Sequence, residues 1–513
     1  MRVTGSGSAG SSGAPRSGRS TRGPDRASRT SAEPAGPAVP TVRRAGPRGS
    51  RPLRPSGHRR PAWPGTAALA VLIFAVQVAS PSVTIGDSRL SAITAWRLLT
   101  HGDLHLESYR VVTALADRYD LVAHDGHLLP YFPWPTMLFV LPAVLLLAAT
   151  GHDPAMLSIA DPARTFLVEV PTAAAVVTVT ALLVRATVRT VEGVGRRSAL
   201  PTLAALVWAF STSAWSIGSR ALWQQTVSMM VLALAVLAAR RLGTGRRWPW
   251  VLGVALAAAP LVRPTDAVFS LLVGIWLVVR HREVLVRVAL PAAAALAVFL
   301  AVSAWQYGTP VPPYYLPSRL AGSAPIGFAD GLALNLVSPS RGLAVYDPVL
   351  LLAVAGVALR WRRRRLDALD AVLVAAVAAQ LLVIAQFGST GGHVFGPRLM
   401  IDVLPLLVVL AAPALAVLTR DGRPERSHTT RRRLAVAGVV AVLAAGLAVN
   451  ATGALLRSSR CWNLEPMDVD ARPSRIWDWA DPQFAWPYRQ LADGGTVGDV
   501  LAPHCDRPAS TTG

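Results

Sequence analysis

The sequence predicts an all-α polytopic membrane protein with about eleven transmembrane helices. Hydrophobic residues make up 52% of the 513 residues and charged residues only 16%, whereas globular domains have about 25% charged residues. Apolar runs long enough to cross a bilayer recur along the chain. The arginines cluster between these runs, as the positive-inside rule describes for membrane proteins.

The N-terminal segment, residues 1–60, is expected to be a disordered, Arg-rich cytoplasmic tail. It contains 13 arginines and two acids, Asp25 and Glu33, among Gly, Ser and Pro residues. Because it has almost no large apolar side chains, it cannot bury enough surface to fold. The net charge of +22 does not indicate nucleic acid as a partner, since such binders gather their charge on one folded face.

The membrane domain is expected at residues 61–452. Its apolar runs lie near 63–81, 166–184, 200–214, 222–239, 249–262, 266–279, 284–304, 346–359, 368–387, 399–419 and 434–452. Arginine-rich connections occur at 185–197, 240–247, 280–287, 360–365 and 420–433. If the N-terminus is inside, all five lie in the cytoplasm. We therefore expect a multi-pass protein of the cell membrane with an external C-terminal tail, residues 453–513.

Residues 131–151 are also apolar enough to span, but a crossing there would invert every later loop. We therefore expect this segment to lie in the outer interface, with Trp134 as an aromatic anchor. The alternative is that this segment does span the membrane. A second, weakly apolar segment must then also cross, so that the later Arg-rich loops stay in the cytoplasm.

The first external loop, residues 82–165, carries many polar groups. Its early part, 87–99, has apolar residues at roughly helical spacing and predicts a short helix lying on the membrane. Asp87 then stands near the helix start, either as a simple cap or as a functional carboxylate. The loop also holds four histidines: His101, His105, His124 and His127. Only the last two are closely spaced and no dense ligand signature is present, so a divalent metal is possible in principle but no metal site is predicted.

Acids within the predicted spans are few. Glu169, Asp266 and Asp402 stand near the ends of the runs, and none stands at mid-membrane. Coupled transporters normally carry ionisable groups at the bilayer midplane. This distribution favours another class of membrane protein.

Five segments, in order, resemble those of membrane glycosyltransferases of the GT-C superfamily, which includes protein O-mannosyltransferases and lipid A aminoarabinose transferases. The first is GDSRLSAITAWRLLTHGDLHLESY, which contains Asp87 just after the first apolar run. The others are STSAWSIGSRALWQQ (211–225), LVRPTD (261–266), LVSPSRGLAVYDPVLLL (336–352) and HVFGPRLMIDVLPLL (393–407). The sequence departs from many relatives at Ser88, where they have a second acid.

The resemblance implies transfer of a sugar from a polyprenyl-phosphate donor to a lipid, glycan or protein hydroxyl on the outer face, without a cofactor. Such a transfer needs a base near the hydroxyl and positive charge near the departing phosphate. One carboxylate suffices for inversion at the anomeric carbon. Asp87 is the candidate base, and Arg220, Arg341 and Arg398 are the candidate donor-phosphate ligands.

The candidate arginines, and Arg263 in the LVRPTD segment, also have simpler interpretations. Arg220 and Arg341 are alternatively interfacial residues that reach the headgroups, and Arg263 is alternatively held by Asp266. Arg398 follows Pro397 at a helix start, where a cation is unfavourable, which indicates an anionic partner. Two other functions stay open: an inactive lipid-binding scaffold of the same fold, and a lipid or small-molecule transporter. The sequence does not decide whether Cys461 and Cys505 are paired.

Overall fold

The computed structural model describes residues 63–84, 87–109, 120–151, 162–191, 198–316, 326–387, 389–419, 429–503 and 505. The predicted tail, residues 1–60, lies outside this part of the chain. Residues 61–513 form a separate unit, and the description below concerns this unit.

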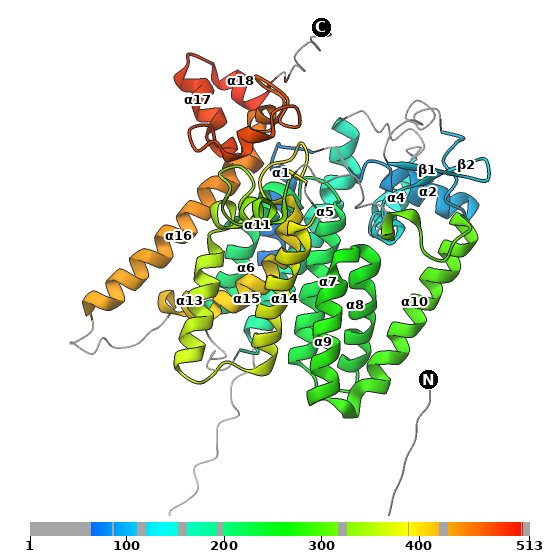
Figure 1. The fold of residues 1–513 in the computed structure, drawn as a ribbon, viewed down its shortest axis with the longest axis horizontal. Helices are drawn as coiled ribbons and strands as arrows, with labels where there is room; N and C mark the ends of the chain where they lie inside the picture. The colour runs from blue at the N-terminus through cyan, green and yellow to red at the C-terminus, as the bar shows by residue number, and fades with distance from the viewer. Residues whose placement is uncertain are drawn as a thin grey trace, which may run out of the picture. The chain divides into compact units, whose positions relative to one another are not determined.

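Each of the eleven predicted runs contains a helix (Figure 1), which confirms the all-α membrane class. The helices are α1 (Trp63–Ala79), α5 (Pro162–Val188), α6 (Leu200–Phe210), α7 (Gln224–Arg240), α8 (Trp248–Val262), α9 (Ala267–Arg280), α10 (Leu285–Tyr307), α13 (Val349–Arg362), α14 (Ala368–Ala385), α15 (Leu404–Leu415) and α16 (Thr429–Leu455). Five of the described helical stretches are long and apolar enough to cross a membrane, and several others are shorter. The number eleven for the membrane crossings stays a prediction.

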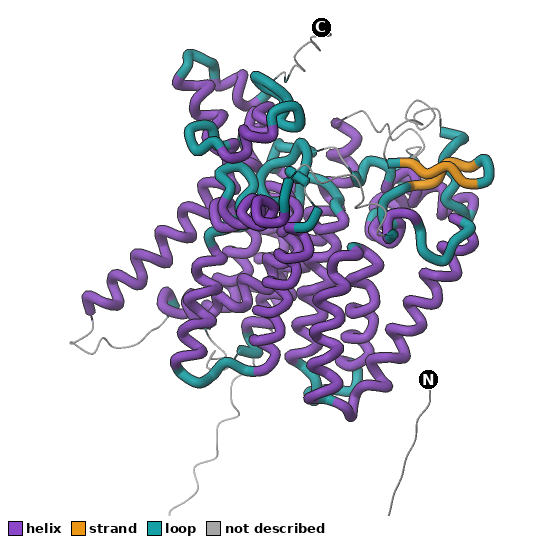
Figure 2. The backbone as a smooth tube through the Cα atoms, in the orientation of Figure 1, coloured by secondary structure: helices purple, strands orange, loops and turns teal. Residues whose placement is uncertain are grey.

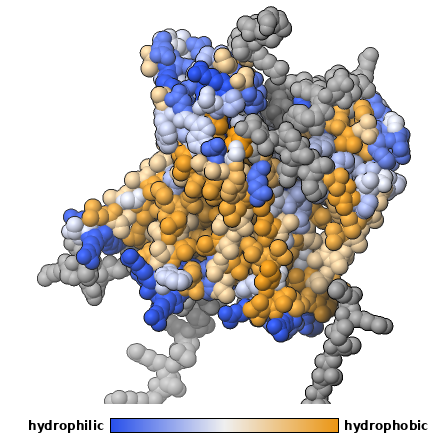
Figure 3. Space-filling view, in the orientation of Figure 1, coloured by the Kyte–Doolittle hydropathy of each residue, from blue (hydrophilic) through white to orange (hydrophobic). Residues whose placement is uncertain are grey.

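The core of the unit is built around α15, which packs against α13, α6, α5 and α7. Residues 404–412 are all buried, and every one of them is apolar or proline. By contrast, α10 and α16 expose large apolar side chains such as Val286, Val298 and Leu434. Figure 3 shows the resulting apolar belt between two hydrophilic ends. Such a belt suits a lipid environment, because water would not solvate it.

The polar end that holds the first loop contains short elements. Helix α2 (Ser91–His101) is followed by the antiparallel hairpin β1 (Leu121–His124) and β2 (His127–Pro130), the one pair of strands in the described chain (Figure 2). Asp125 and Gly126 form its turn with φ angles of 48° and 79°. Two short helices follow, η1 (Trp134–Phe139) and α4 (Leu141–Ala149).

The segment 131–151 does not form a membrane-crossing helix. The nine residues of α4 extend only about 14 Å at 1.5 Å per residue, against a hydrocarbon thickness of about 30 Å. This favours the predicted interfacial position. Trp134, however, is buried: its ring stacks on Phe299 of α10 with centroids 5.6 Å apart, and its Nε1 donates to Ser303. The expected aromatic anchor is therefore a packing residue.

The capping interpretation of Asp87 is wrong. Helix α2 begins at Ser91, its N-cap residue is Leu90, and no side chain caps it. Asp87 instead belongs to the turn formed by residues 87–90. Its carboxylate is thus free of a helix-capping role.

The remaining elements are short helices that connect or follow the longer ones. They are η3 (Ala214–Gly218), η4 (Pro264–Asp266), η5 (Arg282–Val284), η6 (Pro313–Tyr315), α11 (Phe328–Val337), α12 (Leu343–Tyr346), η8 (Arg398–Val403), η9 (Ala416–Leu418), η11 (Arg457–Asn463), η12 (Pro473–Trp477), η13 (Gln483–Ala485), α17 (Trp486–Ala492) and α18 (Val497–Leu501). The C-terminal segment packs on α11 through a cluster of Leu334, Trp462, Val469 and Ile476. A disulfide joins Cys461 to Cys505.

Candidate functional site

Asp87 and Arg398 form an ion pair. Arg398 Nη1 donates to Asp87 Oδ2 at 3.1 Å, across 311 residues of sequence. The two side chains are 13% and 15% exposed, so the pair is largely but not fully withdrawn from water. Asp87 comes from the turn that follows α1, and Arg398 is the first residue of η8. The anionic partner predicted for Arg398 is, in this structure, the carboxylate of Asp87.

The guanidinium of Arg398 has donors to spare. Its Cζ lies 4.6 Å from the ring centroid of Trp223. The buried Nε of Arg398 and the buried indole Nε1 of Trp223 have no hydrogen-bond partner in the described part of the chain. Since buried polar groups are nearly always bonded, two unsatisfied donors beside one cation indicate a place for an anion.

Asp87 also lines a small pocket. Its lining includes Asp87, Ser88, Asp120, Phe132 and Gln224. The pocket has a volume of about 20 Å³, which is room for one water molecule. Neither Arg220 nor Arg341 lines it.

Two further carboxylates stand near Asp87, and the sequence did not single out either of them as part of the site. Asp120 lines the pocket, is 1% exposed and pairs with Arg89 at 2.5 Å. Glu169, on α5, accepts a 2.6 Å hydrogen bond from the hydroxyl of Ser88. Ser88, the position at which the sequence departs from the GT-C pattern it resembles, thus contacts an acid from another helix. Only the three-dimensional fold reveals this, because 81 residues separate the two.

Arg220 is completely buried and holds the chain that leads to Asp87. Its Nη1 donates to the carbonyls of Ser80 (2.6 Å) and Ser82 (3.2 Å), and its Nη2 donates to the carbonyl of Gln77. Its Nε and Nη2 also donate to the hydroxyl of Ser219. Every donor nitrogen is therefore engaged. These carbonyls lie at and just beyond the C-terminus of α1, where a cation is favourable.

Arg341 plays an equivalent part for the chain that leads to Arg398. Its guanidinium donates to the carbonyls of Thr390 (2.9 Å) and Gly392 (3.1 Å) and to the side chain of Gln483 (2.7 Å). Further bonds reach Ser340 O and Asn463 Oδ1. Burial lowers the pKa of Arg341 to about 10 and that of Arg220 to about 9. Both groups therefore stay charged at neutral pH.

A separate polar cluster surrounds Arg263. Its Nη1 donates to Asp402, and its Nη2 donates to the carbonyl of Leu399 at 2.7 Å. The expected partner Asp266 accepts instead from Ser228. Gln380 donates to Asp402 at 2.7 Å. Asp266 and one oxygen of Asp402, Oδ2, therefore have partners within the protein, whereas the buried Oδ1 of Asp402 has no hydrogen-bond partner among the described residues.

Fold and site together define an all-α membrane protein in which a carboxylate and a guanidinium from distant segments meet at one end of the helices. No protein-family model and no curated protein matches the chain. Among solved structures, the chain is similar to ArnT from Cupriavidus metallidurans bound to undecaprenyl phosphate, with 15% identity, a TM-score of 0.48, and coverage of 85% of this chain and 73% of that chain. For ArnT from the same organism in the apo state, the identity is 14%, the TM-score 0.44, and the coverage 84% and 72%.

Proposed function

We propose that this chain is a membrane glycosyltransferase. It moves a hexosyl or pentosyl group from a polyprenyl-phosphate donor to a lipid, glycan or protein hydroxyl on the outer face, with inversion. The ion pair between Asp87 and Arg398 carries the proposal. It brings together, from two of the five GT-C-like segments, the base and the cation that this chemistry requires.

In the proposed reaction, Asp87 accepts the proton of the acceptor hydroxyl as its oxygen attacks the anomeric carbon. The bond from that carbon to the donor phosphate breaks, and polyprenyl phosphate leaves with the electron pair. Arg398 stabilises the negative charge that develops on the phosphate. The arriving phosphate competes with Asp87 for Arg398, which frees the carboxylate to act as a base.

Arg220 and Arg341 take a different part from the one that the sequence predicts for them. Because their donors bond to carbonyls and side-chain oxygens, we assign them to positioning rather than to direct contact with the phosphate. Arg220 fixes residues 77–82 before Asp87, and Arg341 fixes residues 390–392 before Arg398. Their charge also contributes a positive potential near the site.

The test is transfer by membranes and by purified protein, with a panel of radiolabelled polyprenyl-phosphate sugars. Asp87→Asn should lower turnover at least about a hundredfold, the usual contribution of a positioned base. Asp125→Asn is the matched control: Asp125 is 84% exposed in its side chain and stands in the hairpin turn at φ 48°, which Asn tolerates. Near-normal turnover by folded Asp87→Asn protein would refute the assignment.

The other two functions give different results in the same experiment. An inactive scaffold would bind polyprenyl-phosphate sugar with equal affinity in wild type and in Asp87→Asn and would form no product. A transporter would move labelled lipid across proteoliposomes without breaking its sugar–phosphate bond. Either result would contradict the proposed transferase.

A further inference from the structure

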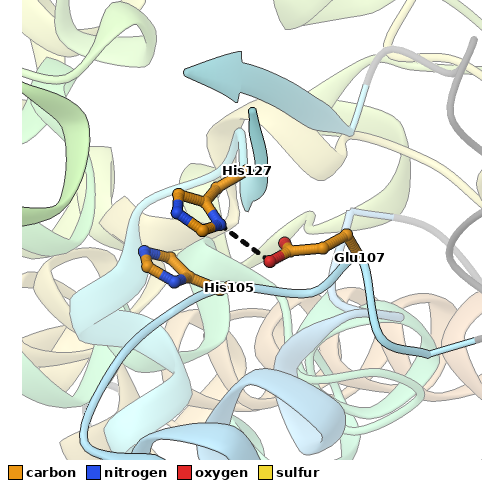
Figure 4. A group of neighbouring side chains, drawn as sticks. All are labelled: His105, Glu107 and His127. Atoms are coloured by element: carbon orange, nitrogen blue, oxygen red, sulfur yellow. Dashed lines mark hydrogen bonds and ion pairs between the residues drawn. The ribbon is translucent and has the colours of Figure 1, made fainter. Parts of the chain in front are cut away.

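We infer that His105, Glu107 and His127 bind a divalent transition metal, with Zn²⁺ as the best match, and that the metal fastens the first loop to the β1–β2 hairpin. One ligand atom from each of the three residues lies within 4.8 Å of the other two. Figure 4 shows the two imidazoles, one above the other, with the Glu107 carboxylate beside them. Two imidazoles and one carboxylate form a ligand set that zinc uses with water in the fourth position.

The backbone already brings these ligands together. The amide of Leu106 donates to the carbonyl of Leu128 at 2.8 Å, so residues 105–107 run beside β2. His105 directly precedes Leu106, and Glu107 directly follows it at the start of a turn that the amide of Tyr109 closes on the carbonyl of Leu106 at 3.1 Å. Glu107 Oε2 accepts from the amide of Leu128 at 3.1 Å. The carboxylate is therefore fixed in front of His127.

The side chains of His105, Glu107 and His127 also lie close to one another. His127 Nδ1 lies 2.7 Å from Glu107 Oε1, and the rings of His105 and His127 stack with centroids 3.7 Å apart. Imidazole is the commonest metal ligand among protein side chains. A metal must lie in the plane of each ring, so the parallel rings tilt apart when it binds. The side chain of His127 is 42% exposed, which leaves room for this movement.

A further carboxylate stands behind His105. Asp103 Oδ2 lies 3.9 Å from His105 Nδ1, and the two Asp103 oxygens are held by Arg97 at 2.5 and 2.8 Å. Metal-binding histidines commonly donate their second ring N–H to such a carboxylate, which fixes the ring orientation. A small rotation of His105 closes this hydrogen bond and leaves Nε2 for the metal.

The metal would hold the first loop against the hairpin, and Asp87 is not among its ligands. Strand β2 ends at Pro130, and Pro130, Phe132 and Pro133 line the pocket that contains Asp87. Fastening β2 to residues 105–107 therefore limits the movement of that wall of the pocket. This inference does not depend on the proposed transferase reaction.

The experiment uses the full chain, purified in detergent without a polyhistidine tag, stripped with a chelator and dialysed against Zn²⁺. Bound zinc is measured by mass spectrometry, and affinity by competition with a chromogenic chelator. Wild type should retain about one Zn²⁺ per chain. His127→Gln and Glu107→Gln should bind at least about tenfold more weakly, since even loss of an outer-shell partner costs 10- to 100-fold. His127→Cys should retain the metal, because a thiolate is also a zinc ligand.

Two control variants make the result specific. His124→Gln alters the residue that pairs with His127 across the hairpin, and it should leave zinc binding unchanged. His393→Gln alters the other group that could hold a metal, His393 with Asp468 and Asp470, and it should also have no effect. Thermal unfolding without metal establishes that each variant folds. Equal zinc retention by folded His127→Gln and wild type, or loss of zinc in either control, would overturn the inference.

Discussion

The positioning role of Arg220 makes a strong prediction about stability. Replacing Arg220 with Met keeps an unbranched side chain of similar length in the buried site but removes all donors. Three carbonyls, those of Gln77, Ser80 and Ser82, then lose their side-chain partner. A buried acceptor left unsatisfied costs about 1–3 kcal/mol, so the three together cost roughly 3–9 kcal/mol. This is a large part of the 5–15 kcal/mol that typically stabilises a folded protein.

The prediction is tested by thermal and denaturant unfolding of purified protein in detergent, followed by tryptophan fluorescence. The stability of Arg220→Lys should lie between those of wild type and Arg220→Met. The lysine ammonium keeps the charge and three donors but lacks the planar guanidinium, whose donors point in fixed directions. Arg287→Met is the control, since Arg287 is an exposed residue of α10 and its loss should change stability by less than about 0.5 kcal/mol.

The result separates positioning from phosphate binding. If Arg220→Met unfolds within about 1 kcal/mol of wild type, well below the 3–9 kcal/mol expected from three unsatisfied carbonyls, the positioning argument fails. Loss of donor binding with unchanged stability would then make Arg220 a direct phosphate ligand, as the sequence indicates.

Three further predictions concern Arg398, the glycine that lies two residues before it, and the C-terminal disulfide. Arg398→Ala should raise the KM for the donor more than that for the acceptor, because it removes the proposed phosphate ligand and leaves Asp87 unpaired; the opposite order in steady-state kinetics would contradict it. Gly396→Ala should destabilise the protein by about 1–3 kcal/mol, since Gly396 has φ +67° and an added Cβ would lie 2.6 Å from Cδ1 of buried Tyr346; an unchanged melting temperature would count against this. Cys505→Ser opens a disulfide with a sequence separation of 44, worth about 4 kcal/mol in the chain-entropy model; increased proteolysis after residue 456 is expected, and equal resistance would contradict it.

Hydropathy alone predicted most of the fold. Each apolar run contains a helix, and the boundaries agree within a few residues, as for 249–262 against α8 (Trp248–Val262). The reason is that a run of apolar residues in lipid can satisfy its backbone only as a helix. The hairpin was not predicted from the sequence, although Asp125-Gly126 is a dipeptide typical of two-residue hairpin turns and stands between the short segments LVAH and HLLP.

The site was predictable in part. The distribution of arginines along the sequence predicts that Asp87 and Arg398 lie on the same side of the membrane, and the structure joins them at 3.1 Å. The function of Arg220 was not accessible from the sequence, because its partners are backbone carbonyls, which leave no pattern in the residue types. The proximity of His105 to His127 also depends on the hairpin, which returns the chain to residues 105–107.

The pairing of Ser88 with Glu169 changes how the departure from the GT-C pattern is understood. Position 88 offers a hydroxyl that donates to Glu169, so it presents no anionic oxygen beside Asp87. The charge of Asp87 is balanced by Arg398, a cation of the protein itself. A second acid at position 88 would face buried Glu169, and two carboxyl groups in contact away from water cannot both ionise without a large cost. Serine therefore suits this position, because its hydroxyl provides a hydrogen bond to buried Glu169 of α5 while Arg398 of η8 balances the charge of Asp87.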